Sequence, residues 1–253
     1  MGEMGRMSES ITVILNCYKR PEYLEEQIKA IRAQSIPPES IWLWVNSTKA
    51  NRKTKFYNLG LDKVFKSDTN CKYHARFAIG LIAQTDYVAF FDDDTIPGKK
   101  WFENCLNTME ETPGILGGAG CVLQSRSYVQ HRRMGWPTQN EFTEPVDLVG
   151  HAWFMRRDDL NHMWSETPFT LENGEDIQLG YLAKKNGGVQ CYCPPHPVDK
   201  PELHSSLKAE QYGNDAKASS NGGLMSIPQF YEQRDQCIDY GITNGWETVL
   251  GVK

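Results

Sequence analysis

Three consecutive aspartates, Asp92 to Asp94, directly follow a short apolar run at 87–91. Adjacent carboxylates repel one another, because like charges a few ångströms apart raise each other's pKa. A hard divalent cation relieves this repulsion, and Mn²⁺ or Mg²⁺ typically binds carboxylates together with substrate phosphates. The alternative is a solvated acidic turn in which Asp94 or Thr95 caps the following helix. Because a buried strand leads into the cluster, we predict a metal site at the carboxyl end of that strand.

The elements that position these aspartates can be inferred from the preceding sequence. Residues 11–17 form a β-branched apolar run, which is typical of a strand buried on both faces. Pro21 suits the first turn of a helix, and apolar residues follow at helical spacing, at Leu24, Ile28 and Ile31. Pro37-Pro38 ends this helix, and residues 41–45 form the next predicted strand. A strand, helix, strand unit of this kind is typical of a parallel doubly wound sheet.

The alternation of strands and helices continues along the chain. We predict further strands at 63–66, 87–91, 115–123, 146–149, 152–155 and 189–193, and further helices at 73–83, 100–111, 176–185 and 228–240. The stretch 194–225 is rich in Pro, Gly, Ser and Asn, so we expect a loop there. The predicted fold class is α/β, with a mostly parallel central sheet flanked by helices. It forms a single domain at 10–253 after a disordered segment at 1–9.

The composition limits the classes of function. Apolar residues make up 40% of the 253 residues and charged residues 23%, as in globular proteins. The net charge of −5 predicts no nucleic-acid partner, because proteins that bind nucleic acid usually carry a basic face. The seven cysteines are irregularly spaced, which favours reduced thiols over zinc ligands. No apolar run reaches the roughly 18 residues of a membrane span, so we expect a soluble, cytoplasmic protein without a transmembrane segment.

Several of these motifs resemble those of one enzyme superfamily. A buried strand ending in Asp-Asp-Asp resembles the DxD motif of GT-A glycosyltransferases. The opening at 14–21 is similar to the start of family 2 enzymes, the segment 70–77 resembles a region of exostosin-like members, and Glu172–Ile177 resembles the late E-D motif. The resemblance implies a GT-A (Rossmann-like) fold and metal-dependent transfer of a sugar from a nucleotide-sugar to a glycan. Residues of about 10–125 would bind the donor and those of about 126–253 the acceptor.

The resemblance also implies roles at the donor site. In such enzymes the last aspartate of the motif meets the metal, so Asp94 is the expected ligand and Asp92 or Asp93 would reach the donor. Asn70 and Arg76 would contact the nucleotide, for which UDP is the default expectation. Four residues that close the first two strands would hold the base and ribose: Asn16, Tyr18, Arg20 and Asn46. Turn formation is the alternative role for these four residues.

A second acidic pair, Glu175-Asp176, lies where a helix is expected to begin. An inverting sugar transfer requires a group that accepts the proton of the acceptor hydroxyl, and a carboxylate is the usual one. The positive end of the helix dipole would keep such a carboxylate ionised. We therefore predict Asp176 as the base and Glu175 as a residue that orients the acceptor. A simple preference of acidic residues for the first helical turn is the alternative explanation.

Three further residues are candidates for the remaining parts of the site. His151 and Trp153 precede the acidic pair, where related enzymes line the acceptor site, and an aromatic face stacks well on a sugar ring. Trp153 is equally suited to a protein core. His204 falls in the predicted loop, and some GT-A enzymes use a late histidine as an extra metal ligand. A loop that closes over the donor would also exclude water.

Two questions stay open at the level of sequence. The family 2 resemblance implies inversion at the anomeric carbon and the exostosin-like one implies retention; we favour inversion because of the position of Asp176. Two other classes of protein remain as alternatives. A haloacid-dehalogenase-like phosphatase also has aspartates after a buried strand, but Ile96 stands where that motif has threonine. A non-catalytic carbohydrate-binding relative would also use the many tryptophans and tyrosines, although it would not need Asp94 and Asp176.

Overall fold

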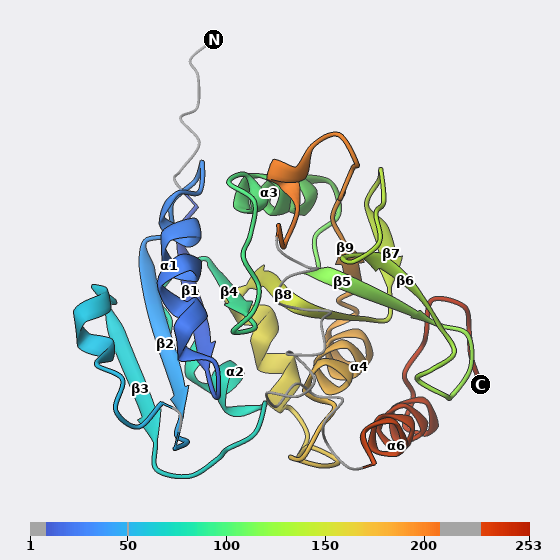
Figure 1. Ribbon diagram of the computed structural model, residues 1–253. Coiled ribbons are helices and arrows are strands. Elements are labelled where there is room, and N and C mark those ends of the chain that lie inside the picture. The colour runs from blue at the N-terminus through green and yellow to red at the C-terminus, as the bar shows by residue number, and fades with distance from the viewer. Residues whose placement is uncertain (1–8, 50, 208–228) are drawn as a thin grey trace.

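The computed structural model describes residues 9–49, 51–207 and 229–253 as an α/β structure built on one sheet (Figure 1). The strands are β1 (Ile11–Cys17), β2 (Ser40–Asn46), β3 (Lys63–Ser67), β4 (Tyr87–Phe91), β5 (Ile115–Leu123), β6 (His131–Gly135), β7 (Glu144–Val146), β8 (Leu148–Arg156) and β9 (Cys191–Cys193). The α-helices are α1 (Leu24–Arg32), α2 (Ala75–Gly80), α3 (Trp101–Glu111), α4 (Glu175–Gly187) and α6 (Phe230–Thr243). Short 3-10 helices include η3 (Arg157–Trp164) and η4 (Pro201–Leu203).

The strand order is β3-β2-β1-β4-β8-β5-β9-β7, with β6 paired to β5. Strands β3, β2, β1 and β4 run parallel, as the apolar sequences of β1, β2 and β4 predict. Strand β8 is antiparallel to both of its neighbours, β4 and β5, so the parallel pairing of the sheet is interrupted there. Strand β9 is parallel to β5, and β7 and β6 are antiparallel to their partners. The main direction of the sheet is therefore parallel, with β8 inserted against it.

Helices cover both faces of the sheet, so that β1 is buried on each side. On one face, Val13 and Leu15 pack with apolar residues of α1 and α3. On the other face, Ile14 packs with Phe77 of α2 and with apolar residues of η3 and α4. A smaller cluster joins α4 to α6 through residues such as Ile238. Because alternate side chains of a strand point to opposite faces, this arrangement explains why the central strands are continuously apolar.

The predicted fold class is confirmed: a mainly parallel central sheet is flanked by helices. The predicted helices and most of the predicted strands correspond to observed elements, with shifts of a few residues at the ends, but the predicted strands at 146–149 and 152–155 lie mainly within the one strand β8. Strand β6, in the region rich in Arg, His and Trp, was not predicted. The predicted disordered segment at 1–9 and the predicted loop at 194–225 fall mostly outside the described residues, as does the expected start of the last helix at Pro228.

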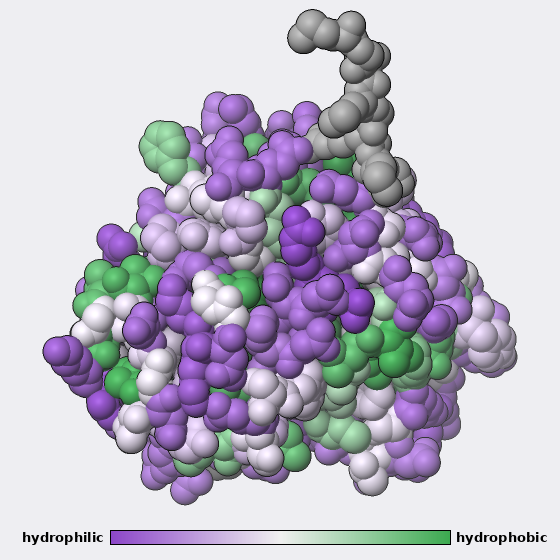
Figure 2. All heavy atoms as spheres, turned by 180° about the vertical axis from the view of Figure 1, so that it is seen from behind, coloured by the Kyte–Doolittle hydropathy of each residue, from purple (hydrophilic) through white to green (hydrophobic). Residues whose placement is uncertain are grey.

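The described surface carries mostly polar side chains, with small apolar areas between them on the face shown in Figure 2. No helix in the described ranges is both long enough and apolar enough to cross a membrane. All seven cysteines are unpaired, and each except Cys71 is buried. Burial among apolar residues explains their frequency better than metal binding does.

Candidate active site

The three aspartates lie where β4 ends at the carboxyl edge of the parallel strands. The N–H of Asp92 donates a hydrogen bond of 2.9 Å to the carbonyl of His151, which continues the pairing of β4 with β8 past the last strand residue. The buried side-chain amide of Gln27 in α1 donates to the carbonyl oxygens of Asp92 and Thr95, at 2.7 and 2.8 Å. The turn that carries the aspartates is therefore held from both sides.

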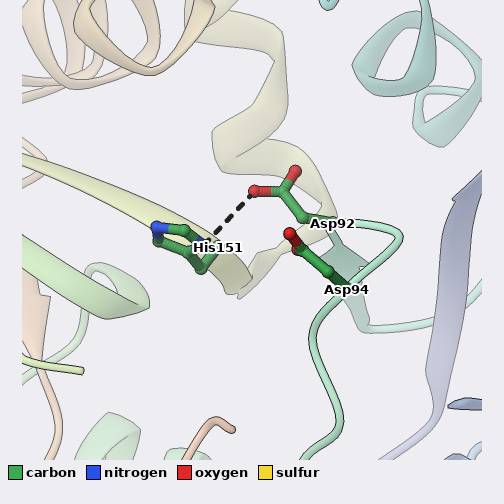
Figure 3. A group of neighbouring side chains, drawn as sticks. All are labelled: Asp92, Asp94 and His151. Atoms are coloured by element: carbon green, nitrogen blue, oxygen red, sulfur yellow. Dashed lines mark ion pairs between the residues drawn. The ribbon is translucent and has the colours of Figure 1, made fainter. Parts of the chain in front are cut away.

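Asp92, Asp94 and His151 form a candidate metal centre (Figure 3). One carboxylate oxygen of each aspartate and one ring nitrogen of the histidine all lie within 4.8 Å of one another. His151 Nδ1 is 3.6 Å from Asp92 Oδ2. Figure 3 shows the histidine approaching from β8 and the aspartates from the turn after β4. The antiparallel strand β8 thus brings together residues that are far apart in sequence.

The backbone of His151 adopts φ 65°, which is uncommon for a residue other than glycine. This left-handed conformation lies beside an irregularity in the pairing of β5 with β8. The imidazole packs against the indole of Trp136, with ring centroids 4.1 Å apart. Loss of solvation lowers the pKa of His151 to about 4, although Asp92 opposes this change. The ring is therefore neutral near pH 7, which is the form that binds a metal.

Arg20 forms ion pairs with both Asp93 and Asp94. Its Nη1 donates to Asp94 Oδ2 at 2.7 Å, and its Nη2 contacts Asp93 Oδ1. Arg20 and both of these aspartates are buried. Burial raises the pKa of Asp93 and that of Asp94 to about 6, and Arg20 acts in the opposite direction on both. The structure therefore places Arg20 as the internal counter-charge of the aspartate cluster.

Arg76 joins the aspartate cluster to the second acidic pair. Its Nη1 contacts Asp92 Oδ1, and its Nη2 lies 3.2 Å from Glu175 Oε1. The guanidinium is buried and lies 4.6 Å from the ring centroid of Trp153. Trp153 is only 2% exposed and also packs against Phe77. The indole thus supports Arg76 and has no open face on which a sugar could stack.

Glu175 and Asp176 form the first turn of α4. Gly174 precedes them with φ 77°, a conformation that glycine adopts without strain. Asp176 Oδ1 accepts from the N–H of Ile177 at 2.9 Å, and its Oδ2 accepts from Arg234 of α6 at 2.6 Å. Burial, together with the neighbouring charge of Asp176, raises the pKa of Glu175 to about 7. The two adjacent carboxyl groups therefore differ strongly in environment.

A polar network lies at the carboxyl ends of β1 and β2. Asn46 Nδ2 donates to Asn70 Oδ1 at 2.7 Å, and Asn70 Nδ2 donates to the hydroxyl of Tyr18 at 3.0 Å. Asn51, which is fully buried, donates to the carbonyl oxygens of Tyr18 and Asn46 at 2.6 and 3.0 Å. Asn16 lies one strand position before the end of β1. The structure thus brings together three of the residues that were predicted to contact the donor.

Two histidines occupy places that differ from the predicted ones. His151, expected at the acceptor site, lies in the candidate metal centre. His204, expected as a metal ligand, is not a member of that centre; its Nε2 is 2.7 Å from the carbonyl oxygen of Pro197, and its ring packs against His196. Three further residues of the site, Gln27, Asn51 and Arg234, were not predicted. Only long-range contacts distinguish these three residues, so no local motif could have identified them.

A Rossmann-like sheet with an acidic cluster after β4 defines the GT-A class of glycosyltransferases. The sequence profile described as Glycosyl transferase family 2 matches residues 12–164, more than half of the chain. The chain belongs to this family, and the protein is a glycosyltransferase. No curated protein matches the chain significantly. The family match includes the aspartate cluster and His151 but ends before Glu175, and the exostosin-like resemblance stays a prediction.

Proposed function

We propose that the protein transfers a sugar from a UDP-sugar to a hydroxyl of a glycan or glycoconjugate, in a reaction that depends on a divalent metal. The observation that carries this proposal is the convergence of Asp92, Asp94 and His151 at the carboxyl end of β4. Nucleotide-binding sites of open α/β sheets lie at this edge. A separate carboxylate that suits a proton acceptor, Asp176, is linked to the same cluster through Glu175 and Arg76.

The residues of the cluster fit a divalent cation. Two carboxylates and a neutral imidazole are ligands of hard to intermediate character, and the nitrogen favours Mn²⁺ over Mg²⁺, which prefers oxygen. Asp94 and Asp92 would be carboxylate ligands, and His151 would replace His204 as the histidine. When bound, the cation supplies positive charge that stabilises the nucleoside diphosphate as it leaves.

The polar network at the ends of β1 and β2 would hold the nucleoside. Tyr18, Asn46 and Asn70 are fixed by mutual hydrogen bonds, so their remaining donors and acceptors are ordered before the donor binds. Such preorganisation lowers the entropic cost of binding. Asn16 lies on the neighbouring part of β1 and would line the same site. Arg20 and Arg76 would act mainly by keeping the aspartates in place.

Asp176 would accept the proton of the acceptor hydroxyl as that oxygen attacks the anomeric carbon. The attack displaces the nucleoside diphosphate from the opposite face, so the configuration inverts. Asp176 is 12% exposed at its side chain, whereas Glu175 is 3% exposed and burial raises its pKa to about 7. The more accessible carboxylate suits proton transfer, and Glu175 would orient the acceptor or the base.

Titration calorimetry with UDP, GDP and CDP tests the proposal, with Mn²⁺, with Mg²⁺ and with a chelator. We expect UDP to bind in the presence of metal, and chelation or the substitution Asp94→Asn to weaken binding by at least about tenfold. Asp158→Asn, at an exposed aspartate of η3, is the matched control. Absence of nucleotide binding under all conditions would contradict the proposal and would favour a carbohydrate-binding relative without turnover.

A further inference from the structure

Arg234 of α6 is a buried cation whose charge is balanced by the proposed base. Its side chain is 1% exposed, and its Nη2 donates to Asp176 Oδ2 at 2.6 Å. Its Nη1 is 3.4 Å from Asn173 Oδ1, in the loop just before α4. A buried guanidinium costs several kcal/mol of desolvation unless it is paired. The ion pair with Asp176 offsets this cost and holds the guanidinium of Arg234 at the start of α4.

Aromatic rings fix the direction of this guanidinium. It lies 4.0 Å from the ring centroid of Tyr128 and 5.5 Å from that of Phe230. Stacking on an aromatic face adds to the ion pair and restricts the plane of the guanidinium. The hydrogen bond to Asp176 therefore comes from one defined direction.

The first turn of α4 also packs directly against α6. A Cβ atom at Gly174 would lie 2.7 Å from Cys237 Sγ, so the backbone of the turn touches α6. The buried side chain of Asn173 donates to the carbonyl of Phe230 at 3.3 Å and accepts from the N–H of Gly174 at 2.7 Å. Helix α6 thus determines both where the acidic pair lies and how Asp176 is oriented.

We propose that Arg234 is a positioning residue for the base Asp176, an inference that rests on the proposed function. An ionised carboxylate has about four acceptor sites. The N–H of Ile177 and the guanidinium of Arg234 each use one, on different oxygens. The carboxylate therefore cannot rotate freely, and its remaining lone pairs keep fixed directions in which they can accept the proton of an acceptor hydroxyl.

The test measures release of UDP from UDP-glucose, UDP-galactose and UDP-N-acetylglucosamine in Mn²⁺, with water as the acceptor. For the substrate that the wild type uses, we expect Arg234→Met to lower kcat by about 10- to 100-fold, which is less than the roughly 10²- to 10⁴-fold that a general base contributes, because Asp176 itself remains. The KM for the donor should change by less than about twofold, because the contacts of Arg234 in the described part of the chain are with Asp176, Asn173 and two aromatic rings and not with the proposed donor residues. Arg234→Lys should recover part of kcat, because an ammonium retains the charge but not the planar geometry.

Two further variants separate positioning from a structural effect. In an Asp176→Asn background, Arg234→Met should lower kcat by less than about threefold, because residues that act as a unit are non-additive. The control is Arg126→Met. It removes an exposed arginine that pairs with Asp239 of α6, and it should leave kcat unchanged. Arg234→Gln serves as a smaller change if the methionine variant does not fold.

The outcomes distinguish the two proposals. A wild-type kcat in Arg234→Met, or a full additional loss in the Asp176→Asn background, would overturn the role of Arg234 while leaving the proposed function intact. A rise in KM that equals the fall in kcat/KM, with kcat unchanged, would also overturn it. Absence of UDP release by the wild type from every donor would contradict the proposed function, and the role of Arg234 with it.

Discussion

Arg76 and Glu175 form a buried ion pair, with Nη2 and Oε1 3.2 Å apart, and the same guanidinium also contacts Asp92. Arg76 therefore connects the aspartate cluster after β4 to the first turn of α4. Because the guanidinium rests on Trp153, its position is set by the core and not by solvent. Arg76 of α2 is thus a direct side-chain link between the two acidic motifs.

Replacement of Arg76 by methionine should destabilise the fold, because it leaves buried carboxyl groups without their partner. We expect the free energy of unfolding to fall by about 3–5 kcal/mol, the usual range for a broken buried ion pair. Denaturation in urea measures this change. Arg157→Met removes an exposed pair with Asp158 and should cost less than about 1 kcal/mol. Equal effects of the two substitutions would show that Arg76 does not hold the motifs together.

The double variant Arg76→Met with Glu175→Gln tests which partner matters. A neutral amide in place of the buried carboxyl removes the uncompensated charge, so it should restore part of the lost stability, by about 1 kcal/mol or more. If the second substitution makes the protein less stable still, the destabilisation arises from lost packing of the Arg76 side chain and not from its charge.

Two substitutions at His151, to glycine and to alanine, both remove the imidazole but differ in backbone strain. Both His151→Gly and His151→Ala should weaken Mn²⁺ binding by at least about tenfold, because the nitrogen ligand is lost. His151→Gly should be the more stable variant by about 1 kcal/mol, since only glycine adopts φ 65° without strain. Calorimetric titration of Mn²⁺ and thermal denaturation provide the two measurements. Unchanged Mn²⁺ affinity in both variants would exclude His151 as a ligand.

The pKa of Glu175 predicts how stability depends on pH. Burial raises this pKa from 4.5 to about 7 in the folded protein, so folding favours the protonated carboxyl. The contribution is complete below about pH 4.5 and is lost as pH rises through about 7. As the pH rises from 5 to 8, the unfolding free energy of the wild type should therefore fall. We expect the fall in Glu175→Gln to be smaller than that in the wild type by at least about 1 kcal/mol. Parallel pH profiles would mean that Glu175 is already ionised at pH 5.

Asn51 should stabilise the proposed nucleoside site through the backbone of Tyr18 and Asn46. Its amide satisfies the carbonyl oxygens of Tyr18 and Asn46 in a fully buried position. Asn51→Ala removes both of these buried hydrogen bonds, although the carbonyl of Tyr18 keeps one from the hydroxyl of Thr48, so we expect a loss of about 1–3 kcal/mol in unfolding free energy, together with weaker UDP binding. Lys53→Ala, at an exposed position close by, is the control. Unchanged UDP affinity in a destabilised Asn51→Ala protein would restrict its role to stability.

Local sequence patterns were sufficient to predict the parallel half of the fold. The apolar runs of β1, β2 and β4 are buried on both faces, so each run is visible without knowledge of its neighbours. The aspartates follow β4 directly, and their place at the carboxyl end of the sheet follows from the direction of that strand. For the same reason, Tyr18 and Asn46 could be expected near each other because each follows or ends a neighbouring strand, whereas Asn70 was predicted only from the exostosin-like resemblance.

The rest of the site depends on contacts between distant segments. The insertion of β8 between β4 and β5, antiparallel to both, brings His151 to Asp92, and no local pattern fixes that pairing. The pairing of Arg234 with Asp176 depends in the same way on how α6 docks against α4. The role of Trp153 was ambiguous from the sequence, because tryptophan suits both stacking on a sugar ring and packing in a protein core.

The most direct test of the proposed metal-dependent site is a crystal structure with UDP and Mn²⁺, with diffraction data recorded at the manganese absorption edge. We expect one anomalous peak bonded to carboxylate oxygens of Asp92 and Asp94 and to a ring nitrogen of His151, next to the diphosphate. A peak bound to other residues, or UDP bound at the ends of β1 and β2 without any metal, would contradict it.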